Sequence, residues 1–371
     1  MNVVTPVSQS TSHQPTRGLA LFFCLLLCLL FLPARKQLAA VEPAWLKQSG
    51  GVLAKLNAVF FTDREHGWAA GSNGTLLATN DGGTHWQPLP LPGRTRKEPV
   101  LDLWAFAPDQ VCLLGEYGLF NRSGEVAWHE RVFVLRSEDR GASWLEARTA
   151  PPPLQPGQSI IIKQINKDTA KIEEPKPPPE PVLVRFAFVN ARIGWAVGEL
   201  GTIQFTRDGG QSWQLQFTQL RKLFNDVSAL NEQQAWIVGG GGTILQTGDG
   251  GQSWQPQTAG NSANLLAVHF ADAKHGWAAG NNGTMLATTN GGLRWQTQIT
   301  GTTRTLYDVF FVNTREGWAA GERGTLLHTT DGGATWQDNS LETHANLHRL
   351  FFLSPDCGWA VGGNGALFKY E

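Results

Sequence analysis

The residues of this chain that could do chemistry recur in a short motif, Ser/Thr-x-Asp/Asn-x-Gly-x-x-Trp, where one carboxylate or amide lies among glycines beside a tryptophan. Such a group could serve a metal site or a catalytic site. A calcium loop needs several oxygen ligands in one turn, however, and each copy offers one carboxylate at most. A catalytic site normally occurs once per chain, whereas this motif occurs six times, beginning at Thr79, Ser137, Thr206, Thr247, Thr288 and Thr329.

We interpret each copy as a self-capped hairpin turn, called an Asp box below. The Asp or Asn side chain can accept hydrogen bonds from backbone N–H groups two residues on, and glycine supplies the positive φ that a tight turn needs. The tryptophan that ends the motif then packs into the fold. On this interpretation Asp331, in "TTDGGATW", stabilises a turn. The sequence predicts no catalytic residue, no metal and no cofactor.

A second phrase, "GWAAG" or a close variant, lies upstream of the Asp boxes. The last five tryptophans of this phrase are each 41 residues apart, and Cys112 takes the place of the tryptophan in one degenerate copy. A period in the low forties with four short strands per unit is typical of propeller blades. The tryptophans of the phrase are Trp68, Trp195, Trp236, Trp277, Trp318 and Trp359.

The four strands can be read within one repeat, residues 265–299, as "LLAVHF", "GWAAG", "GTMLATT" and "RWQTQI", and the Asp box joins the third strand to the fourth. No stretch after the leader has a helical period. We therefore predict an all-β fold, a seven-bladed β-propeller with Asp-box turns. The seven first strands are expected at 56–61, 101–106, 183–188, 224–230, 265–270, 306–311 and 347–352.

The last blade lacks an Asp box and a fourth strand, because the chain ends at "GALFKYE". Near the start, "PAWLKQSGGVLAKLNAVFF" aligns with "RWQTQITGTTRTLYDVFF", so residues 45–49 resemble a fourth strand that precedes the first blade. We predict that this N-terminal strand completes the last blade, closes the ring and removes an exposed sheet edge.

The N-terminal region has a different character. Residues 18–32, "GLALFFCLLLCLLFL", form an apolar run with the length of a signal sequence, short for a full membrane span. A cleaved signal and a retained anchor both remain open. We expect 1–44 to be an export signal or membrane anchor with a linker and 45–371 to be an exported propeller, although Arg35 and Lys36 oppose that orientation.

Composition narrows the classes of function. The net charge of −1 gives no support for nucleic-acid binding. Cys24 and Cys28 lie in the leader, while Cys112 and Cys357 are separated by blade one, so we expect a buried small residue and a lone thiol and no disulfide. The spacing of cysteines and histidines suggests no metal site.

Two insertions interrupt the repeat, both in blade two. About 14 extra residues lie between its second and third strands, and a segment at about 148–181 carries nine prolines. The composition of this second segment predicts an extended arm without a packed element of its own. A surface insertion without a role is the alternative. In a propeller both insertions leave from the same face.

The same face gathers basic residues. From the loops and the starts of the first strands we predict a partner-binding set of Arg94, Arg96, Arg221, Lys222, Arg304, Arg323 and Arg349. Lys55, Lys97 and His348 accompany them, as do the acidic residues Glu116, Glu199, Glu322 and Asp308. An excess of positive charge around a funnel indicates an anionic or carboxylate-bearing partner, and a solvated rim without a partner is the alternative.

The units of the form "GWAAG…GTLLATNDGGTHWQ", seven to a chain behind an export or anchor segment, resemble the photosystem II stability/assembly factor family, over about residues 45–371 apart from the insertions. The resemblance implies a seven-bladed Asp-box propeller that is not an enzyme. It implies an assembly factor, expected as a monomer, that binds membrane-protein subunits on the extracytoplasmic side, in the periplasm or thylakoid lumen. The proline-rich segment and the worn second blade depart from the family pattern.

Two other functions remain open. A sialidase-like glycoside hydrolase would need a tyrosine nucleophile paired with a glutamate, and arginines that grip a carboxylate. The nearest approach is Tyr307 with Glu322, Arg304, Arg323 and Arg349. Sialidases have six blades, which counts against this hypothesis. A periplasmic propeller that binds carbohydrate or peptide, or that serves another envelope complex, would share the scaffold and differ in its partner.

Overall fold

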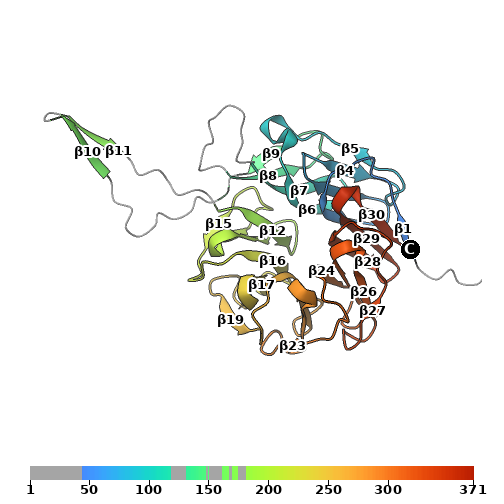
Figure 1. The fold of residues 1–371 in the computed structure, drawn as a ribbon. Coiled ribbons are helices and arrows are strands. Elements are labelled where there is room, and N and C mark those ends of the chain that lie inside the picture. The colour runs from blue at the N-terminus through green and yellow to red at the C-terminus, as the bar shows by residue number, and fades with distance from the viewer. Residues whose placement is uncertain (1–43, 118–130, 148, 150–160, 167–168, 174–180) are drawn as a thin grey trace, which may run out of the picture. The chain divides into compact units, whose positions relative to one another are not determined.

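The computed structural model describes residues 44–117, 131–147, 149, 161–166, 169–173 and 181–371. Within the compact unit Pro43–Glu371, seven four-stranded antiparallel sheets follow one another around a ring (Figure 1). The first strand of each sheet contacts the first strands of both neighbouring sheets. The prediction of an all-β, seven-bladed propeller is therefore confirmed.

In blades one to six the strands follow chain order from the axis outwards, and in blade seven β1 takes the outermost place. The first strands are β2 (Leu56–Phe61), β6 (Val100–Ala107), β12 (Leu183–Phe188), β16 (Phe224–Ala229), β20 (Leu265–Phe270), β24 (Leu306–Phe311) and β28 (Leu347–Ser354). The second strands are β3 (Gly67–Gly71), β7 (Gln110–Glu116), β13 (Gly194–Gly198), β17 (Ala235–Gly239), β21 (Gly276–Gly280), β25 (Gly317–Gly321) and β29 (Cys357–Gly362).

The outer half of each blade is shorter. The third strands are β4 (Leu76–Thr79), β8 (Val132–Ser137), β14 (Ile203–Thr206), β18 (Thr243–Thr247), β22 (Met285–Thr288), β26 (Leu326–Thr329) and β30 (Leu367–Tyr370). The fourth strands are β5 (Gln87–Pro88), β9 (Leu145–Ala147), β15 (Gln214–Gln216), β19 (Gln255–Thr258), β23 (Gln296–Thr297), β27 (Gln337–Asp338) and, for blade seven, β1 (Trp45–Lys47).

Short 3₁₀ helices mark the loops on one side of the ring. Helix η1 (Gly93–Lys97) joins blade one to blade two. The others join second to third strands in blades three to seven: η2 (Glu199–Gly201), η3 (Gly240–Gly242), η4 (Asn281–Gly283), η5 (Glu322–Gly324) and η6 (Gly363–Gly365).

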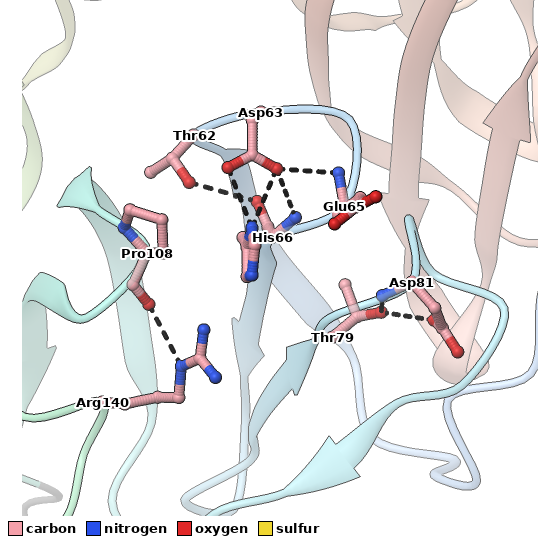
Figure 2. Close-up of polar contacts among 8 residues, drawn as sticks. All are labelled: Thr62, Asp63, Glu65, His66, Thr79, Asp81, Pro108 and Arg140. Carbon is pink, nitrogen blue, oxygen red and sulfur yellow. Dashed lines mark hydrogen bonds and ion pairs between the residues drawn. The ribbon is translucent and has the colours of Figure 1, made fainter.

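The Asp box is a turn held by its own side chains. In blade one the Thr79 hydroxyl donates to Asp81 Oδ1 over 2.8 Å (Figure 2). The same hydroxyl accepts from the Gly83 N–H over 2.9 Å. The His85 N–H then donates to Asp81 Oδ1 over 2.9 Å. The carboxylate thus caps an N–H group four residues on, and not two, because Gly82 and Gly83 at φ 69° and 94° fold the chain back over it.

The same bonds explain why Asp331 is a turn residue. Its Oδ1 accepts the Thr335 N–H over 2.9 Å and its Oδ2 accepts the Thr335 hydroxyl over 2.6 Å. These bonds, with that from Thr329, lower the pKa of Asp331 to about 2. The carboxylate is committed to its own loop, as the repeated motif predicts.

The second-strand tryptophans hold neighbouring blades together. The indole of Trp277 stacks on Phe311 of the next blade, with ring centroids 3.4 Å apart. Its Nε1–H donates to the oxygen of Gly332, in the next Asp box, over 2.9 Å. Trp236 makes the equivalent bond to Gly291 over 3.0 Å. The Asp boxes of blades five and six therefore each accept a hydrogen bond from the blade before them.

Two irregular blades depart from this pattern in a way the sequence explains. Blade two has Cys112 in place of the tryptophan, and the Arg136 guanidinium donates instead to the oxygen of Gly209 over 2.6 Å. Blade seven has no Asp box, so the buried Nε1 of Trp318 in blade six has no hydrogen-bond partner in the described part of the chain. Trp318 stacks on His328 at 4.0 Å instead.

The N-terminal strand closes the ring. Strand β1 pairs antiparallel with β30, with Trp45 opposite Tyr370 and Lys47 opposite Phe368. The Trp45 ring packs edge-on against Trp318 at 5.5 Å. The expected strand at 45–49 is thus found as Trp45–Lys47, on the last blade.

The arm between β9 and β12 contains a regular element. Strands β10 (Ile161–Asn166) and β11 (Thr169–Glu173) form an antiparallel hairpin with Ile162 opposite Ile172. The sequence predicted an extended arm without a packed element, and it did not predict the two-stranded hairpin within that arm. Between its proline clusters, "IIIKQINKDTAKI" is rich in β-branched residues and has Asn and Asp at the turn, which favours a hairpin. The other insertion lies between β7 and β8, and 118–130 fall outside the described residues.

Cys112 and Cys357 are buried free thiols, as expected. Cys24, Cys28 and the apolar run at 18–32 fall outside the described residues. No helix within the described ranges is long and apolar enough to cross a membrane. The roles predicted for 1–44 therefore stay predictions.

Candidate partner-binding face

The antiparallel order of the blades sorts all loops onto two faces. The box face carries the Asp boxes and the loops between first and second strands. The opposite face, called the loop face below, carries the loops between second and third strands and the segments that join one blade to the next. In blade one these two kinds of loop are bonded directly, since the Gly74 N–H donates to the oxygen of Glu98 over 3.0 Å.

Six of the seven residues predicted to bind a partner lie exposed on the loop face. Five come from the segments between blades and one from η5: Arg94, Arg96, Arg221, Lys222, Arg304 and Arg323. Arg94 donates to Glu146 over 2.9 Å and lies 4.5 Å over the ring of Tyr117, and Arg304 donates to the Thr325 hydroxyl over 3.2 Å. These contacts hold some of the cations in fixed positions.

The acidic residues of the loop face are mostly neutralised by neighbours. Arg131 pairs with Glu116 at 3.4 Å and with Glu199 at 3.1 Å. Glu322 accepts the Thr305 N–H over 3.1 Å. The pairing with Arg131 reduces the negative charge that Glu116 and Glu199 present at this face.

Arg349, the seventh predicted residue, lies in the central channel and not on the rim. Its side chain is only 19% exposed and lies 3.6 Å from Asp308 and 3.8 Å from Asp226. The expectation that it acts as an exposed rim cation needs correction. The physical reason is its register: Arg349 is the third residue of a first strand, whose side chain points to the axis.

The third residue of every first strand lies in this channel, and five of the seven are charged. Around the ring they are Ala58, Asp102, Arg185, Asp226, Ala267, Asp308 and Arg349. Each arginine bridges two aspartates, since Arg185 lies 3.6 Å from Asp102 and 3.4 Å from Asp226. Sequence reasoning missed Asp102, Arg185 and Asp226. The sequence did contain a signal for them, which was a charged residue at the third position of otherwise apolar first strands.

Each of these aspartates also joins its blade to the next one. Asp102 accepts the Phe186 N–H over 3.0 Å, and Asp226 accepts the Val268 N–H over 2.8 Å. Asp308 makes the same bond to Leu350 over 2.7 Å. The second carboxylate oxygens of Asp102 and Asp226 make no hydrogen bond in the described part of the chain. The carboxylates are therefore structural ties with one oxygen left for the arginines.

Burial controls the protonation of this cluster. It raises the pKa of Asp226 to about 6, although Arg349 and Arg185 act in the opposite direction. Burial likewise raises the pKa of Asp308. Burial disfavours the charge on Arg349, but Asp308, Asp102 and Asp226 together raise its pKa above the ordinary value. Arg349 stays charged, while Asp226 and Asp308 titrate above the usual range of an aspartate.

The channel opens on the loop face beside more basic groups. Burial and the charge of Arg185 lower the pKa of Lys55. Burial, Lys55 and Arg185 lower the pKa of His348 to about 4. Burial is the main cause of both shifts, and the neighbouring cations Arg185 and Lys55 add to it.

A cavity of about 160 Å³ lies on the axis, lined largely by the fifth residues of the first strands: Phe60, Trp104, Ala187, Ser228, His269, Phe310 and Phe351. Phe60 packs against Phe351 at 4.5 Å and against Trp104 at 4.8 Å. Ligand pockets usually have several hundred Å³. The aromatic side chains thus fill most of the channel.

The proposed sialidase-like set does not form a catalytic arrangement. Tyr307 reaches Glu322 over 3.5 Å, but burial and Glu322 raise its pKa, the opposite of what a nucleophile needs. Arg349 is paired with the channel aspartates. No cluster of three or more His, Cys, Asp or Glu side chains in the described residues is placed to hold a metal ion.

Comparison with known proteins decides the family. The model of the family described as "Photosynthesis system II assembly factor YCF48" matches residues 38–176, 166–257, 219–288, 260–344 and 296–371. The chain belongs to the YCF48 family. A photosystem II assembly lipoprotein Ycf48 of Trichormus variabilis is 36% identical over 99 residues, 26% of this chain and 27% of the relative. Alignments with the matching Ycf48 proteins span between 21% and 39% of their length.

Solved structures agree on the fold. The structure of YCF48 bound to D1 peptide covers 90% of this chain and 98% of its own, with 22% identity and a TM-score of 0.67. The Niastella koreensis GH74 enzyme, with 15% identity and a TM-score of 0.63, covers 88% of this chain and 53% of its own. Since an enzyme and a peptide-binding protein both share the architecture, these likenesses show the fold alone.

Proposed function

We propose that this chain is a non-enzymatic assembly factor of the photosystem II type that binds membrane-protein subunits through its loop face. Membership of the YCF48 family is the observation that carries the proposal. The relative bound to D1 peptide supports it, because that protein binds a segment of another protein on the same architecture.

The loop face supplies the means of recognition in this proposal. Three of its exposed cations, Arg96, Lys222 and Arg323, make no ion pair in the described residues and can meet carboxylates of a partner. Glu116 and Glu199 are paired with Arg131, so they compete little with a partner's carboxylates for the exposed cations. Six near-identical Asp boxes on the other face offer a partner fewer distinguishing features. Residues 1–44 serve in this proposal as export signal or membrane anchor.

Co-purification from solubilised membranes of the host tests the proposal. The charge reversal Arg304→Glu with Arg323→Glu should weaken capture of the membrane subunit and should leave the melting temperature nearly unchanged, because both side chains are exposed. The matched control reverses two exposed cations of the box face, Arg192→Glu with Lys274→Glu. Loss of the subunit in the control but not in the loop-face variant would show that the proposed face is wrong.

A further inference from the structure

A second site lies on the box face, in the groove between blades five and six. The groove has a volume of about 570 Å³, within the range of ligand pockets. Asn290 and Arg294 of the blade-five box line one wall, and Arg315 and Asp331 of blade six line the other. No feature of the proposed partner-binding face takes part in it.

The blade-five box is the odd member of the repeat. Asn290 stands where the other five boxes have Asp, and Arg294 stands where they have Ser, Thr or His. In those boxes the side chain at this position bonds the aspartate, as Ser253 bonds Asp249 over 2.7 Å. In blade five the turn survives through its backbone, because the Arg294 N–H donates to Asn290 Oδ1 over 3.0 Å. The guanidinium is therefore released from any role in the turn.

The two arginines of the groove are both available to a ligand. Arg294 and Arg315 are exposed, and their guanidinium groups make no hydrogen bond or ion pair with any described residue. The carboxylate of Asp331, in contrast, is engaged by Thr335. Two uncommitted cations thus face a carboxylate that is already satisfied.

The equivalent groove between blades one and two shows that this charge is not a property of the fold. It has a volume of about 470 Å³ and is lined by Asp81, Asp139, His85 and Arg140. Two aspartates and one arginine there replace the two arginines and one aspartate of the other groove. Arg140 is also tied to the oxygen of Pro108 over 3.4 Å (Figure 2). The two grooves therefore differ in charge, and the groove of blades five and six is the more positive of the two.

We propose that the groove between blades five and six binds an acidic sugar, a uronic-acid unit of an oligosaccharide. Arg294 and Arg315 pair with its carboxylate, since planar guanidinium groups bind carboxylates in two-pronged fashion. The amides of Asn290 and Gln296 and the hydroxyls of Thr289 and Thr314 line the same groove. Amides and hydroxyls both donate and accept hydrogen bonds, as sugar hydroxyls do.

An acidic peptide fits this groove less well. Its apolar lining residues are Ala287 and Trp277, and Trp277 is buried against Phe311, which leaves no apolar pocket for peptide side chains. The groove therefore favours a ligand that is polar on all sides.

Calorimetric titration of the purified full chain with trigalacturonic acid tests the proposal. Neutral galactotriose, triglutamate and inorganic phosphate are the comparison probes. Arg294→Ser installs the side chain that other boxes carry, so it should fold as the parent does, and Arg315→Gln removes the charge but keeps a polar, unbranched side chain at an exposed position. Each should weaken trigalacturonate binding by about tenfold or more through loss of a charge-assisted bond. His85→Ala, in the matched groove, should leave binding unchanged.

Tighter binding of trigalacturonate than of the three other probes, lost in both arginine variants, would support the site. Equal binding of triglutamate or phosphate would show a general anion site and overturn the assignment to sugar. Absence of binding to the parent, or unchanged affinity in Arg294→Ser and Arg315→Gln at an unchanged melting temperature, would overturn the site itself. None of these outcomes bears on capture of a membrane subunit by the loop face.

Discussion

The indole N–H of Trp359 donates a hydrogen bond of 3.2 Å to the backbone oxygen of Gly82, which joins the last blade to the Asp box of the first. The ring of Trp359 also stacks on Phe61 of the first blade at 3.4 Å. One buried side chain of blade seven therefore holds the closure of the ring together with strand β1.

Replacement of this tryptophan should be among the most damaging changes in the chain. Trp359 is fully buried, so Trp359→Ala should lower the free energy of unfolding by about 3 to 5 kcal/mol through the cavity it leaves. Asp331→Ala should have a small effect, because it removes turn bonds at an exposed site. Urea denaturation of both variants checks the order, and a larger loss from Asp331→Ala would contradict our interpretation of the box.

Removal of residues 45–50 should destabilise the whole propeller. The deletion removes β1 and the Trp45 ring and leaves β30 as an exposed edge. We expect the melting temperature to fall by about 5 °C or more. A deletion variant that melts within a degree or two of the parent would contradict closure by this strand.

Arg349 should behave differently from the exposed cations of the loop face. Arg349→Met leaves Asp308 without its buried arginine and Asp226 with Arg185 alone, which should cost about 3 kcal/mol of stability. Arg323→Met, at an exposed position, should change stability by less than about 0.5 kcal/mol. Denaturation curves of the two variants make the comparison, and equal effects would mean that the channel ion pairs contribute little.

Asp226 should give the stability a specific dependence on pH. Its pKa in the folded protein is raised to about 6, so it contributes stability that is present below the unfolded pKa and is lost as pH rises through about 6. Asp226→Asn keeps an acceptor for the Val268 N–H and cannot titrate. Relative to the variant, the parent should therefore be more stable near pH 4 than near pH 8, by up to about 3 kcal/mol.

Paired denaturation curves at those two pH values measure this difference. His269 and His348 have lowered pKa values and oppose the trend, but they are present in both proteins and cancel in the comparison. A difference that does not change with pH would show that Asp226 is not perturbed in the folded protein.

Replacement of residues 151–181 by a short Gly/Ser linker should leave the melting temperature within about 2 °C of the parent. Hairpin β10–β11 is a two-stranded sheet of its own, separate from the seven blades. A large fall in melting temperature would show that the hairpin stabilises the propeller. Reduced capture of the membrane subunit at unchanged stability would assign the arm to partner binding.

The sequence by itself determined the local architecture, because each blade is a local unit and its period can be recognised from the repeated tryptophans and Asp boxes. It also determined closure by residues 45–47. The start of the chain has a fourth strand without a blade, and the last blade lacks a fourth strand, so the first must complete the second. Arg94 and Arg323 could be placed on the loop face because loop order in an antiparallel blade fixes the face.

Only the tertiary structure decided how distant charges combine. Asp226, Asp308 and Arg349 meet in the channel because ring closure brings the third residue of each first strand to the axis, from positions up to 123 residues apart. Cys112 has no indole N–H to donate, and Arg136 can take over this bond only because blade three places the oxygen of Gly209 beside the Arg136 guanidinium. Such pairings depend on side-chain direction and on contacts between blades, and a repeat pattern that describes one blade at a time does not contain them.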